Sequence, residues 1–287
     1  MKRLPYAPRA LWRFFLSLPL SGRIGLVISL LWIFIALFGS MLAPYGMEDV
    51  SNASAFGPPS SAYWLGTDYL GRDLFTRILV GARYSIGLAL AAALLASICG
   101  TLLALLATVI GHWFDEIVSR LVDALLITPS KIFALLMIAI YGSSLPVLIL
   151  TAAVTYMPGA YRIAHAQAVG LNAMEYVMVA RMRGESIWHI ASREILPNMI
   201  HPMMADFGLR FVYIILMLSG LSFLGLGVQP PYADWGSLVR ENLSGLFDGS
   251  PAVVMPALAI ATLTIGTNLL IDSLTSRKRI KIKEGQS

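Results

Sequence analysis

The sequence predicts an all-α integral membrane protein with six transmembrane helices and both termini in the cytoplasm. Three observations lead to this prediction: an apolar composition, six apolar stretches of spanning length, and basic residues concentrated in alternate loops. Of the 287 residues, 57% are hydrophobic and only 13% are charged, whereas a soluble domain usually has about 25% charged residues. This composition excludes an ordinary soluble enzyme, a disordered chain and a disulfide-rich secreted module.

The six predicted spans follow from length and apolarity, because about 20 apolar residues are needed to cross the hydrocarbon core of a bilayer. In chain order they cover residues 24–43, 85–110, 117–141, 145–163, 209–228 and 253–274. Pro129 predicts a kink in the third span, since proline cannot complete the helical hydrogen-bond ladder. The basic N-terminal segment has no small-residue cleavage site before the first span, so we expect that span to stay in the bilayer.

Basic residues predict the orientation of the spans and a division of the chain. Most of the 21 Lys and Arg residues lie in the N-terminal segment, in the loops after the second and fourth spans, and in the C-terminal tail. The positive-inside rule places those segments in the cytoplasm. The predicted parts are a cytoplasmic segment (1–23), a first span with its outer loop (24–84), a core (85–274) that contains a long cytoplasmic loop (164–208), and a basic tail (275–287).

The residue inventory argues against chemistry carried by this chain. No lysine stands in the glycine-rich pattern of a phosphate-binding loop, so we expect no ATP hydrolysis here. The four histidines lack metal-ligand spacing, and we predict no catalytic residues, no metal site and no bound cofactor. The net charge of +5 is assigned to cytoplasmic loops rather than to nucleic acid. The single cysteine, Cys99, lies in an apolar run and is predicted to be a buried structural thiol.

The long cytoplasmic loop contains a helix, a glycine turn and a second short helix. Residues 173–183 are good helix formers, and Gly184 interrupts them. Ser186 is a suitable N-cap for a second helix over residues 186–194. We expect Leu196-Pro197 to end that helix, because the residue before a proline disfavours the helical conformation.

The second helix has one apolar side. Ile187, Ile190 and Ala191 recur at i, i+3 and i+4. Such a helix can enter the groove of a partner protein, or it can lie on the membrane surface. The spacing alone leaves both interpretations open.

A second motif lies in the outer loop, within residues 64–87. Asp68 with Arg72, and Asp73 with Arg77, have the i, i+4 spacing of helical ion pairs. Asp73 is also a suitable N-cap, and apolar residues form one stripe over the turns that follow. We therefore expect a short amphipathic helix at the outer surface of the membrane, and we favour an interfacial anchor over a substrate contact.

The cytoplasmic loop resembles the coupling-loop signature of ABC importer permeases. In that family a Glu-Ala-Ala triplet stands three residues before a glycine, and Leu-Pro follows that glycine at +12 and +13. Here the triplet is Met178, Val179 and Ala180, the glycine is Gly184, and Leu196-Pro197 hold the last positions. The spacing matches, although Met178 and Val179 replace Glu and Ala. The residues that the resemblance implies for coupling to an ATPase are Glu175, Ala180, Gly184, Glu185, Ser186, Ile187, Trp188, Ile190, Leu196 and Pro197.

The outer motif is similar to the signature of one branch of these importers, the dipeptide, oligopeptide and nickel permeases. The matching residues are Trp64, Gly66, Thr67, Asp68, Gly71, Arg72, Asp73, Arg77, Gly81, Ala82, Arg83 and Ser85. Seven of them are here named the outer signature: Gly66, Thr67, Asp68, Gly71, Arg72, Asp73 and Arg77. A second string, residues 222–231 followed by Asp234-Trp235-Gly236, matches the same branch. The size and the N-terminal span suggest the C-type subunit of a permease pair.

The resemblance implies a fold, a function and partners. The fold would be that of a type I ABC importer permease. The chain would form half of the pathway for a peptide-like or related small solute, which moves by ATP-driven alternating access. Its partners in the bacterial cytoplasmic (inner) membrane would be a homologous second permease, two ABC ATPase subunits that bind ATP and Mg, and an extracytoplasmic solute-binding protein. The solute and the residues that line its path are not indicated.

The sequence fits two other classes of membrane protein less well. A self-sufficient channel or secondary transporter typically needs intramembrane ion sites or inverted repeats, and neither is convincing here. A membrane enzyme would need a clustered catalytic set. Polar residues inside the predicted spans are few, and we expect most of them to reach the interface from span ends. They are Asp123, Lys131, Arg162, Asn268 and Asp272.

The fifth predicted span has small residues at its outer end. Gly220, Gly225 and Gly227, with Ser219 and Ser222, predict close helix packing. We hypothesise that this end of the span lies at the interface between the two permeases.

Overall fold

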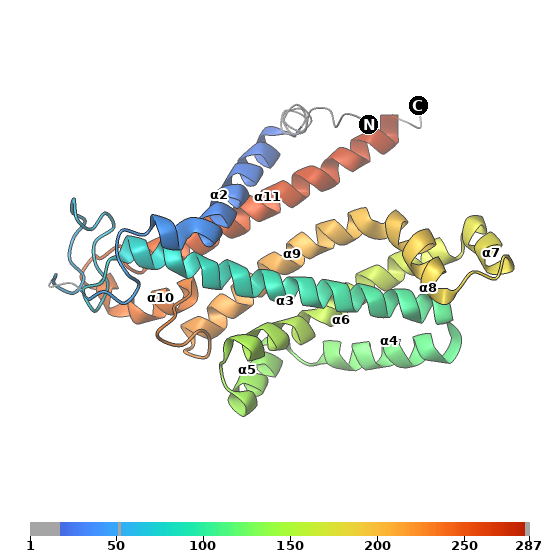
Figure 1. The fold of residues 1–287 in the computed structure, drawn as a ribbon, viewed down its shortest axis with the longest axis horizontal. Coiled ribbons are helices and arrows are strands. Elements are labelled where there is room, and N and C mark those ends of the chain that lie inside the picture. The colour runs from blue at the N-terminus through green and yellow to red at the C-terminus, as the bar shows by residue number, and fades with distance from the viewer. Residues whose placement is uncertain (1–17, 51–52, 285–287) are drawn as a thin grey trace, which may run out of the picture.

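The computed structural model describes residues 18–50 and 53–284. The N-terminal segment predicted at residues 1–23 lies mostly outside the described residues. Within the described ranges all regular elements are helices (Figure 1). Five helices are long and apolar enough to cross a membrane, and a bent pair makes a sixth span. The predicted all-α architecture with six spans is confirmed.

The six spans follow the predicted order. They are α2 (Leu20–Leu42), α3 (Leu74–Ile110), the pair α4 (His112–Ile127) and α5 (Ser130–Tyr141), α6 (Leu145–Asn172), α9 (Leu196–Phe223) and α11 (Val254–Glu284). The kink predicted at Pro129 is a complete break, because α4 and α5 meet at 88°. Proline removes a backbone donor and also disfavours helix at the residue before it.

Several helices extend beyond the apolar stretches that predicted them. α3 begins at Leu74 rather than at residue 85, and α6 continues to Asn172 rather than ending at residue 163. Apolarity marks the part of a helix that lipid or protein covers, whereas hydrogen bonding continues the helix into polar sequence. The fifth span is shorter than predicted at its outer end: α9 stops at Phe223, and Gly225 turns the chain with a φ of +86°.

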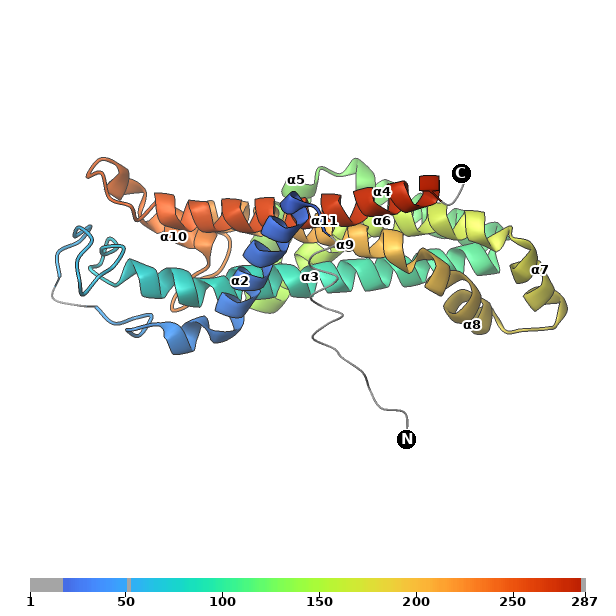
Figure 2. The same cartoon turned by 90° about the horizontal axis from the view of Figure 1, so that it is seen from above.

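Helix α3 forms the centre of the bundle and packs against α6, α2 and α9 (Figures 1 and 2). Small residues allow the close approaches. A Cβ atom added to Gly100 would lie 2.7 Å from the Cβ atom of Ala160 on α6. On the antiparallel pair of α2 and α11, a Cβ atom added to Gly25 would lie 2.5 Å from the carbonyl oxygen of Gly266. Small residues at such contacts are the usual means of helix association in membranes.

The prediction that Cys99 is buried is wrong, because its side chain is exposed on α3. It shares an uncovered face with Leu95 and Leu102, which lie one turn away on either side. In a membrane protein an apolar run faces lipid as readily as it faces the protein core. Hydrophobicity alone therefore does not specify burial here.

Candidate functional site

The two motif regions lie at opposite ends of the bundle. Figures 1 and 2 show α7 and α8 at one end and α10 at the other. The first region is the coupling loop, which lies at the predicted cytoplasmic end. The second contains the outer signature and lies at the predicted outer end.

The coupling loop folds as a helix, a glycine turn and a second helix, as predicted. It contains α7 (Glu175–Met182), α8 (Ile187–His189) and a six-residue π-helix, η1 (Ile190–Ile195). Gly184 has a φ of +75° between α7 and α8, a conformation that glycine adopts without steric cost. Ser186 caps the second helix, because its hydroxyl accepts a hydrogen bond of 3.2 Å from the backbone N–H of His189.

The predicted helix end at Leu196-Pro197 is wrong. α8, η1 and α9 follow one another without a break, and residues Ile187–Phe223 form one helical span. Pro197 falls in the first turn of α9, directly after η1. A π-helical turn is wider than an α-helical turn, so it accommodates a residue that has no backbone N–H to donate. Leu196 is half-buried there and Pro197 is exposed.

The inner face of the coupling loop is part of an apolar core. Ala180 on α7, and Ile190, Ala191 and Ile195 on η1, are almost completely buried and pack with residues of α3 and α6. Ile187 does not join them, since 48% of it is exposed. The predicted apolar side is thus confirmed for Ile190 and Ala191 but not for Ile187. The change from α to π geometry after His189 alters the rotation between successive side chains.

Two polar side chains tie α7 to the end of α3. The Nη2 atom of Arg181 donates to the carbonyl oxygen of Val109 at 3.1 Å and to the Oδ1 atom of Asn172 at 2.9 Å. Asn172 in turn donates to the carbonyl oxygen of Thr108 at 3.3 Å. These carbonyls belong to the last turn of α3, where they have no partner within the helix. The sequence analysis missed both roles, because no short-range pattern connects residue 181 with residue 109.

The outward face of the coupling loop is apolar and uncovered. The exposed large side chains there are Met174, Tyr176, Met178, Val179, Met182, Ile187 and Trp188. Glu175 is exposed beside them, and the Glu185 carboxylate lies 3.8 Å from Nδ1 of His189. Met178 and Val179, the two departures from the family triplet, both belong to this face. Large apolar side chains exposed together in this way mark a surface for another protein or for lipid.

Asp68 is the centre of the outer signature. Its side chain is fully buried, and its Oδ1 atom accepts hydrogen bonds of 2.9 Å from the backbone N–H groups of Leu70 and Arg72. Its Oδ2 atom accepts from Nε of Arg72 at 2.8 Å and from Nη1 of Arg77 at 2.6 Å. The predicted pair of Asp68 and Arg72 is confirmed.

The predicted pair of Asp73 and Arg77 is wrong. Arg77 instead binds Asp68 and the Glu241 carboxylate, the latter at 3.0 Å. Asp73 caps α3, as predicted, by accepting from the backbone N–H of Thr76 at 2.8 Å. A carboxylate that turns toward the first-turn N–H groups does not also reach a side chain at i+4.

The expected amphipathic helix at the outer membrane surface is not a separate element. The residues assigned to it form the first turns of α3, and both Leu74 and Arg77 are buried. The chain before α3 folds tightly as well. Gly66 has a φ of +78°, and a Cβ atom there would lie 2.4 Å from the carbonyl oxygen of Gly57. The Thr67 hydroxyl accepts from the N–H of Gly57 at 2.7 Å, and Gly71 also has a positive φ.

The second string packs directly on the first. It forms α10 (Trp235–Glu241), which is followed by a 3₁₀ turn, η2 (Leu243–Leu246). The indole N–H of Trp235 donates to the carbonyl oxygen of Ile78 at 3.0 Å, and its backbone N–H donates to the Ser85 hydroxyl at 2.9 Å. Asn242 accepts from the backbone N–H of Tyr69 at 3.0 Å. Glu241 and Asn242 were not identified from the sequence, because their partners are more than 160 residues away.

Asp234 begins α10 in a capping box with Ser237. Burial raises the pKa of the Asp234 carboxyl, while hydrogen bonds from Ser222 and Ser237 act in the opposite direction. The outer region is therefore built from local caps and ion pairs, such as Asp68 with Arg72, and from contacts distant in the sequence, such as Arg77 with Glu241.

The small residues of the fifth span have two different environments. A Cβ atom added to Gly236 would lie 2.3 Å from the carbonyl oxygen of Ser219, so close packing occurs there. A Cβ atom added to Gly220 would meet nothing within 4 Å, so Gly220 is not closely packed within this chain, and its place at the interface between two permeases stays a prediction. Gly220 lines an open, mainly apolar groove of about 440 Å³ between α9, α10 and α11, together with residues such as Phe223 and Ile260.

Neither region has the form of a chemical site. Among the described residues, no three His, Cys, Asp or Glu side chains are grouped to hold a metal ion. Asp68 pairs with Arg72 and Arg77, while Asp73 and Asp234 cap helices. The coupling loop exposes large apolar side chains beside charged ones. The arrangement can hold the helices in place and present surfaces to other proteins.

Comparisons with known proteins agree on one kind of protein. The family model described as "Binding-protein-dependent transport system inner membrane component" matches residues 96–280. The glutathione transport system permease protein GsiD of Pectobacterium atrosepticum is 35% identical over 276 residues, which are 96% of this chain and 91% of the relative. The dipeptide transport system permease protein DppC of Alkalihalophilus pseudofirmus is 33% identical over 260 residues, which are 91% of this chain and 86% of the relative.

A solved structure shows the same fold. The crystal structure of an amino acid ABC transporter with histidines matches with a TM-score of 0.50 over 70% of this chain and 93% of that chain, at 16% sequence identity. The matched family and relatives are transport-system permeases. They disfavour the alternative of a self-sufficient channel or secondary transporter.

Proposed function

This chain belongs to the family of binding-protein-dependent transport system inner membrane components, and from that premise we propose that it forms half of the pathway of an ABC importer for peptides. It is a multi-pass permease of the inner membrane. The proposal that the solute is a peptide rests on the names of two relatives, of which one is a glutathione permease and the other a dipeptide permease. Glutathione and dipeptides share amide bonds, a free ammonium and free carboxylates.

The outward face of the coupling loop is the observation that supports an ATPase partner. Its apolar side chains are exposed, while the helix under them is buried and tied to α3 by Arg181. η1 continues into α9, so a displacement of the loop is carried directly into a membrane span. We assign ATP and Mg to two partner ATPase subunits that bind this face, and both chain termini to the same, cytoplasmic side.

The groove beside Gly220 is proposed as the contact for a homologous second permease. It is mainly apolar, it is open, and it lies between the two spans α9 and α11 and the short helix α10. A solute-binding protein would meet the opposite end of the bundle, where the outer signature is held by buried ion pairs. ATP-driven alternating access then requires movement between the two permeases rather than within the outer region.

The first experiment is a pull-down of the tagged chain from its native membranes in mild detergent, followed by mass spectrometry. We expect a second six-span permease and two ATPases with phosphate-binding loops. Recovery of the chain alone, with solute transport that needs no ATP, would contradict the proposal.

A substitution sharpens this test. Trp188→Ala removes an exposed aromatic anchor from the coupling loop, and interface tryptophans often contribute about 2 kcal/mol or more to binding. We expect at least about a tenfold loss of ATPase recovery and of ATP-driven uptake. Trp113→Ala is the matched control, since Trp113 on α4 is 68% exposed and Trp188 is 61% exposed. Equal losses in both variants would show that the coupling loop is not the specific contact.

The second permease has its own test. Gly220→Leu adds a side chain to the open groove, at a position where a Cβ atom meets nothing within 4 Å. We expect the isolated chain to keep its thermal stability and the permease pair to be lost. Unchanged yield of the complex and unchanged uptake would exclude the groove as the contact.

A further inference from the structure

An ion pair between α4 and α6, which both belong to the six spans, is exposed. Arg162 donates from Nη2 to the Oδ1 atom of Asp123, and the two side chains are 56% and 46% exposed. At 1.5 Å per residue, Asp123 lies about 16 Å from the start of α4, and Arg162 lies about 15 Å from the end of α6. Each residue therefore lies about three turns inside its helix. The expectation that these residues reach an interface from span ends stays a prediction.

A second ion pair in the same bundle shows the usual arrangement. Asp206 and Arg210 on α9 are joined at 2.6 Å, and both side chains are buried. Arg210 also donates to the carbonyl oxygen of Tyr156 on α6 at 2.5 Å. Charges at membrane depth normally face protein or water in this way, because hydrocarbon does not solvate them. Asp123 and Arg162 lack such a protein cover within this chain.

Helix α4 has two adjacent exposed faces of different character, which meet where Arg120 follows Ile117 by three residues. One carries Glu116, Arg120 and Asp123, spaced at i, i+4 and i+7. The other carries Trp113, Ile117 and Leu121, spaced at i, i+4 and i+8. The apolar face suits lipid or a partner helix. The charged face, which turns toward Arg162, requires a polar environment along the length of α4.

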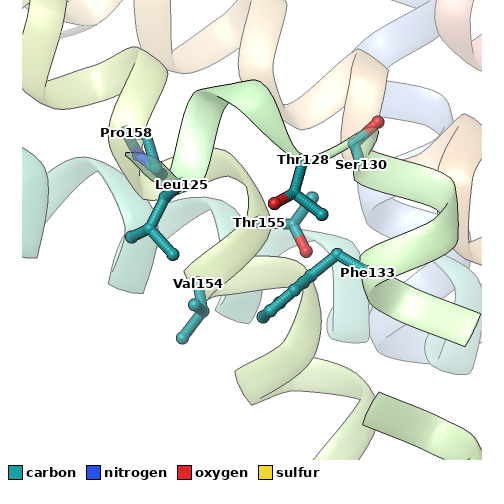
Figure 3. Close-up of a pocket in the computed structure, with 7 residues that line it drawn as sticks. All are labelled: Leu125, Thr128, Ser130, Phe133, Val154, Thr155 and Pro158. Atoms are coloured by element: carbon teal, nitrogen blue, oxygen red, sulfur yellow. The ribbon is translucent and has the colours of Figure 1, made fainter. Parts of the chain in front are cut away.

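The break between α4 and α5 lies about one turn beyond Asp123. Figure 3 shows Thr128 and Thr155 at this break, where they line a cavity of about 20 Å³ with Pro158 and others. That volume is enough for one water molecule. Thr128 and Ser130 are exposed beside it. A broken helix leaves backbone groups without partners, which at membrane depth is tolerated only inside protein or beside water.

We propose that the face of α4 and α6 around Asp123 and Arg162 lines the aqueous pathway, and that this ion pair binds the charged ends of a zwitterionic solute. The inference rests on the proposed transport function and names the chemistry of its solute. The Arg162 guanidinium would bind a carboxylate of the solute in bidentate form, and the Asp123 carboxylate would bind its ammonium group.

The exchange of partners explains why a pathway would contain such a pair. Without solute, the two charges neutralise one another. With solute, one ion pair is replaced by two, so neither protein charge is left without a counter-charge. Binding is then weak enough for release, because each new contact is gained at the expense of an existing one.

The first test measures access to water. In a Cys99→Ser background, which removes the only cysteine of the sequence, single cysteines replace Arg120 on the charged face and Thr128 beside the cavity. Leu121→Cys is the control on the apolar face, about 100° around the helix from Arg120. A membrane-impermeant, charged methanethiosulfonate is applied to the full complex in membrane vesicles of both orientations. Thiols react as thiolates, which need water, so we expect at least about a tenfold faster reaction at Arg120→Cys and Thr128→Cys.

The second test measures solute binding at the same place. Glycylglycine is the zwitterionic probe, and its N-acetylated, C-amidated analogue is the neutral control. We expect glycylglycine to slow the labelling of Thr128→Cys severalfold and the neutral analogue to have no effect. Arg162→Gln and Asp123→Asn should each abolish this protection, while Arg162→Lys should retain part of it.

The outcomes separate the inference from the proposed function. Slow labelling on both faces of α4, in a complex that still contains its ATPases, overturns the inference and leaves the function intact. Fast labelling without protection by glycylglycine overturns the solute site alone. Failure to recover any ATPase or second permease counts against the proposed function instead.

Discussion

The two ends of the bundle are held together by different forces. The outer signature depends on buried charges, with Asp68, Arg77 and Glu241 joined across 160 residues of chain. The coupling loop depends on apolar contacts of residues such as Ile195, and it leaves an apolar face uncovered. A buried ion-pair network tolerates little displacement, because any opening leaves a charge without a partner. Apolar side chains can shift against one another at a smaller cost in free energy, because no charge loses its partner.

This difference suggests a division of labour. The outer end is a fixed frame from which α3 and α10 start, and the coupling end is the part that can respond to a partner. Four comparisons between matched residues test that division. They proceed from the largest expected effect to the smallest.

Arg77→Met should destabilise the chain by about 3–5 kcal/mol, because it leaves the buried carboxylate of Asp68 without a main counter-charge. Arg181→Met at the coupling end removes hydrogen bonds to two exposed or partly buried acceptors and should cost about 1 kcal/mol. Titration with SDS, followed by tryptophan fluorescence of the purified protein in mixed micelles, measures both. Equal losses would contradict the contrast between the two ends.

Ile195→Ala should cost about 2–5 kcal/mol, since Ile195 is completely buried under the coupling loop. Ile187→Ala, in the same loop but on the outward face, should change the stability by about 0.5 kcal/mol or less. The same SDS titration compares them. Recovery of the ATPase in the pull-down should not follow the stability of the free chain. Ile187→Ala should lower this recovery although it leaves the free chain stable. If Ile187→Ala destabilised the free chain as much as Ile195→Ala, the outward face would be a packed one.

Glycine conformation gives a third contrast, because Gly66 and Gly184 have nearly the same positive φ. Gly184→Ala meets no atom within 4 Å, so only the left-handed conformation opposes it, at about 1–2 kcal/mol. Gly66→Ala adds a clash with Gly57, worth about 1–3 kcal/mol more. In detergent, the midpoint temperature of thermal unfolding should be clearly lower for Gly66→Ala than for Gly184→Ala. The opposite order would mean that the outer loop yields more readily than the coupling loop.

The same contrast explains what could be predicted from the sequence. Local patterns identified the spans, the Asp73 cap, the Ser186 cap and the Gly184 turn, since each depends on residues within a few positions. Local patterns fail where the partners are distant. The i, i+4 spacing pairs Arg77 with Asp73, because no local rule connects Arg77 with Glu241.

Membrane context limits the prediction from sequence at two further places. Apolarity does not distinguish a lipid-facing residue such as Cys99 from a core residue. Position in a span did not reveal that Asp123 and Arg162 pair with each other. The outward apolar face of the coupling loop came from a family pattern, and only the structure separates its exposed Met178 from its buried Ala180.

The smallest effect concerns pH and the cap of α10. Burial raises the pKa of Asp234 in the folded chain above the value of about 3.9 for an unfolded chain. Below the unfolded pKa the carboxyl is neutral in both states. As the pH rises through that value, the unfolded state ionises first and gains stability, so the folded chain loses stability until the pH passes the raised pKa.

Asp234→Asn removes this titration and keeps a side chain that caps helices well. We therefore expect the thermal midpoint of the unsubstituted protein to fall, relative to that of Asp234→Asn, as the pH rises from about 4. Ser237→Ala is the matched control: it disrupts the same capping box without removing the carboxyl, so its own difference from the unsubstituted protein should vary far less with pH. A constant difference between Asp234→Asn and the unsubstituted protein would show that the carboxyl is solvated in the native state. The outer frame would then open to water at α10, and its contrast with the coupling loop would rest on Asp68 and Arg77 alone.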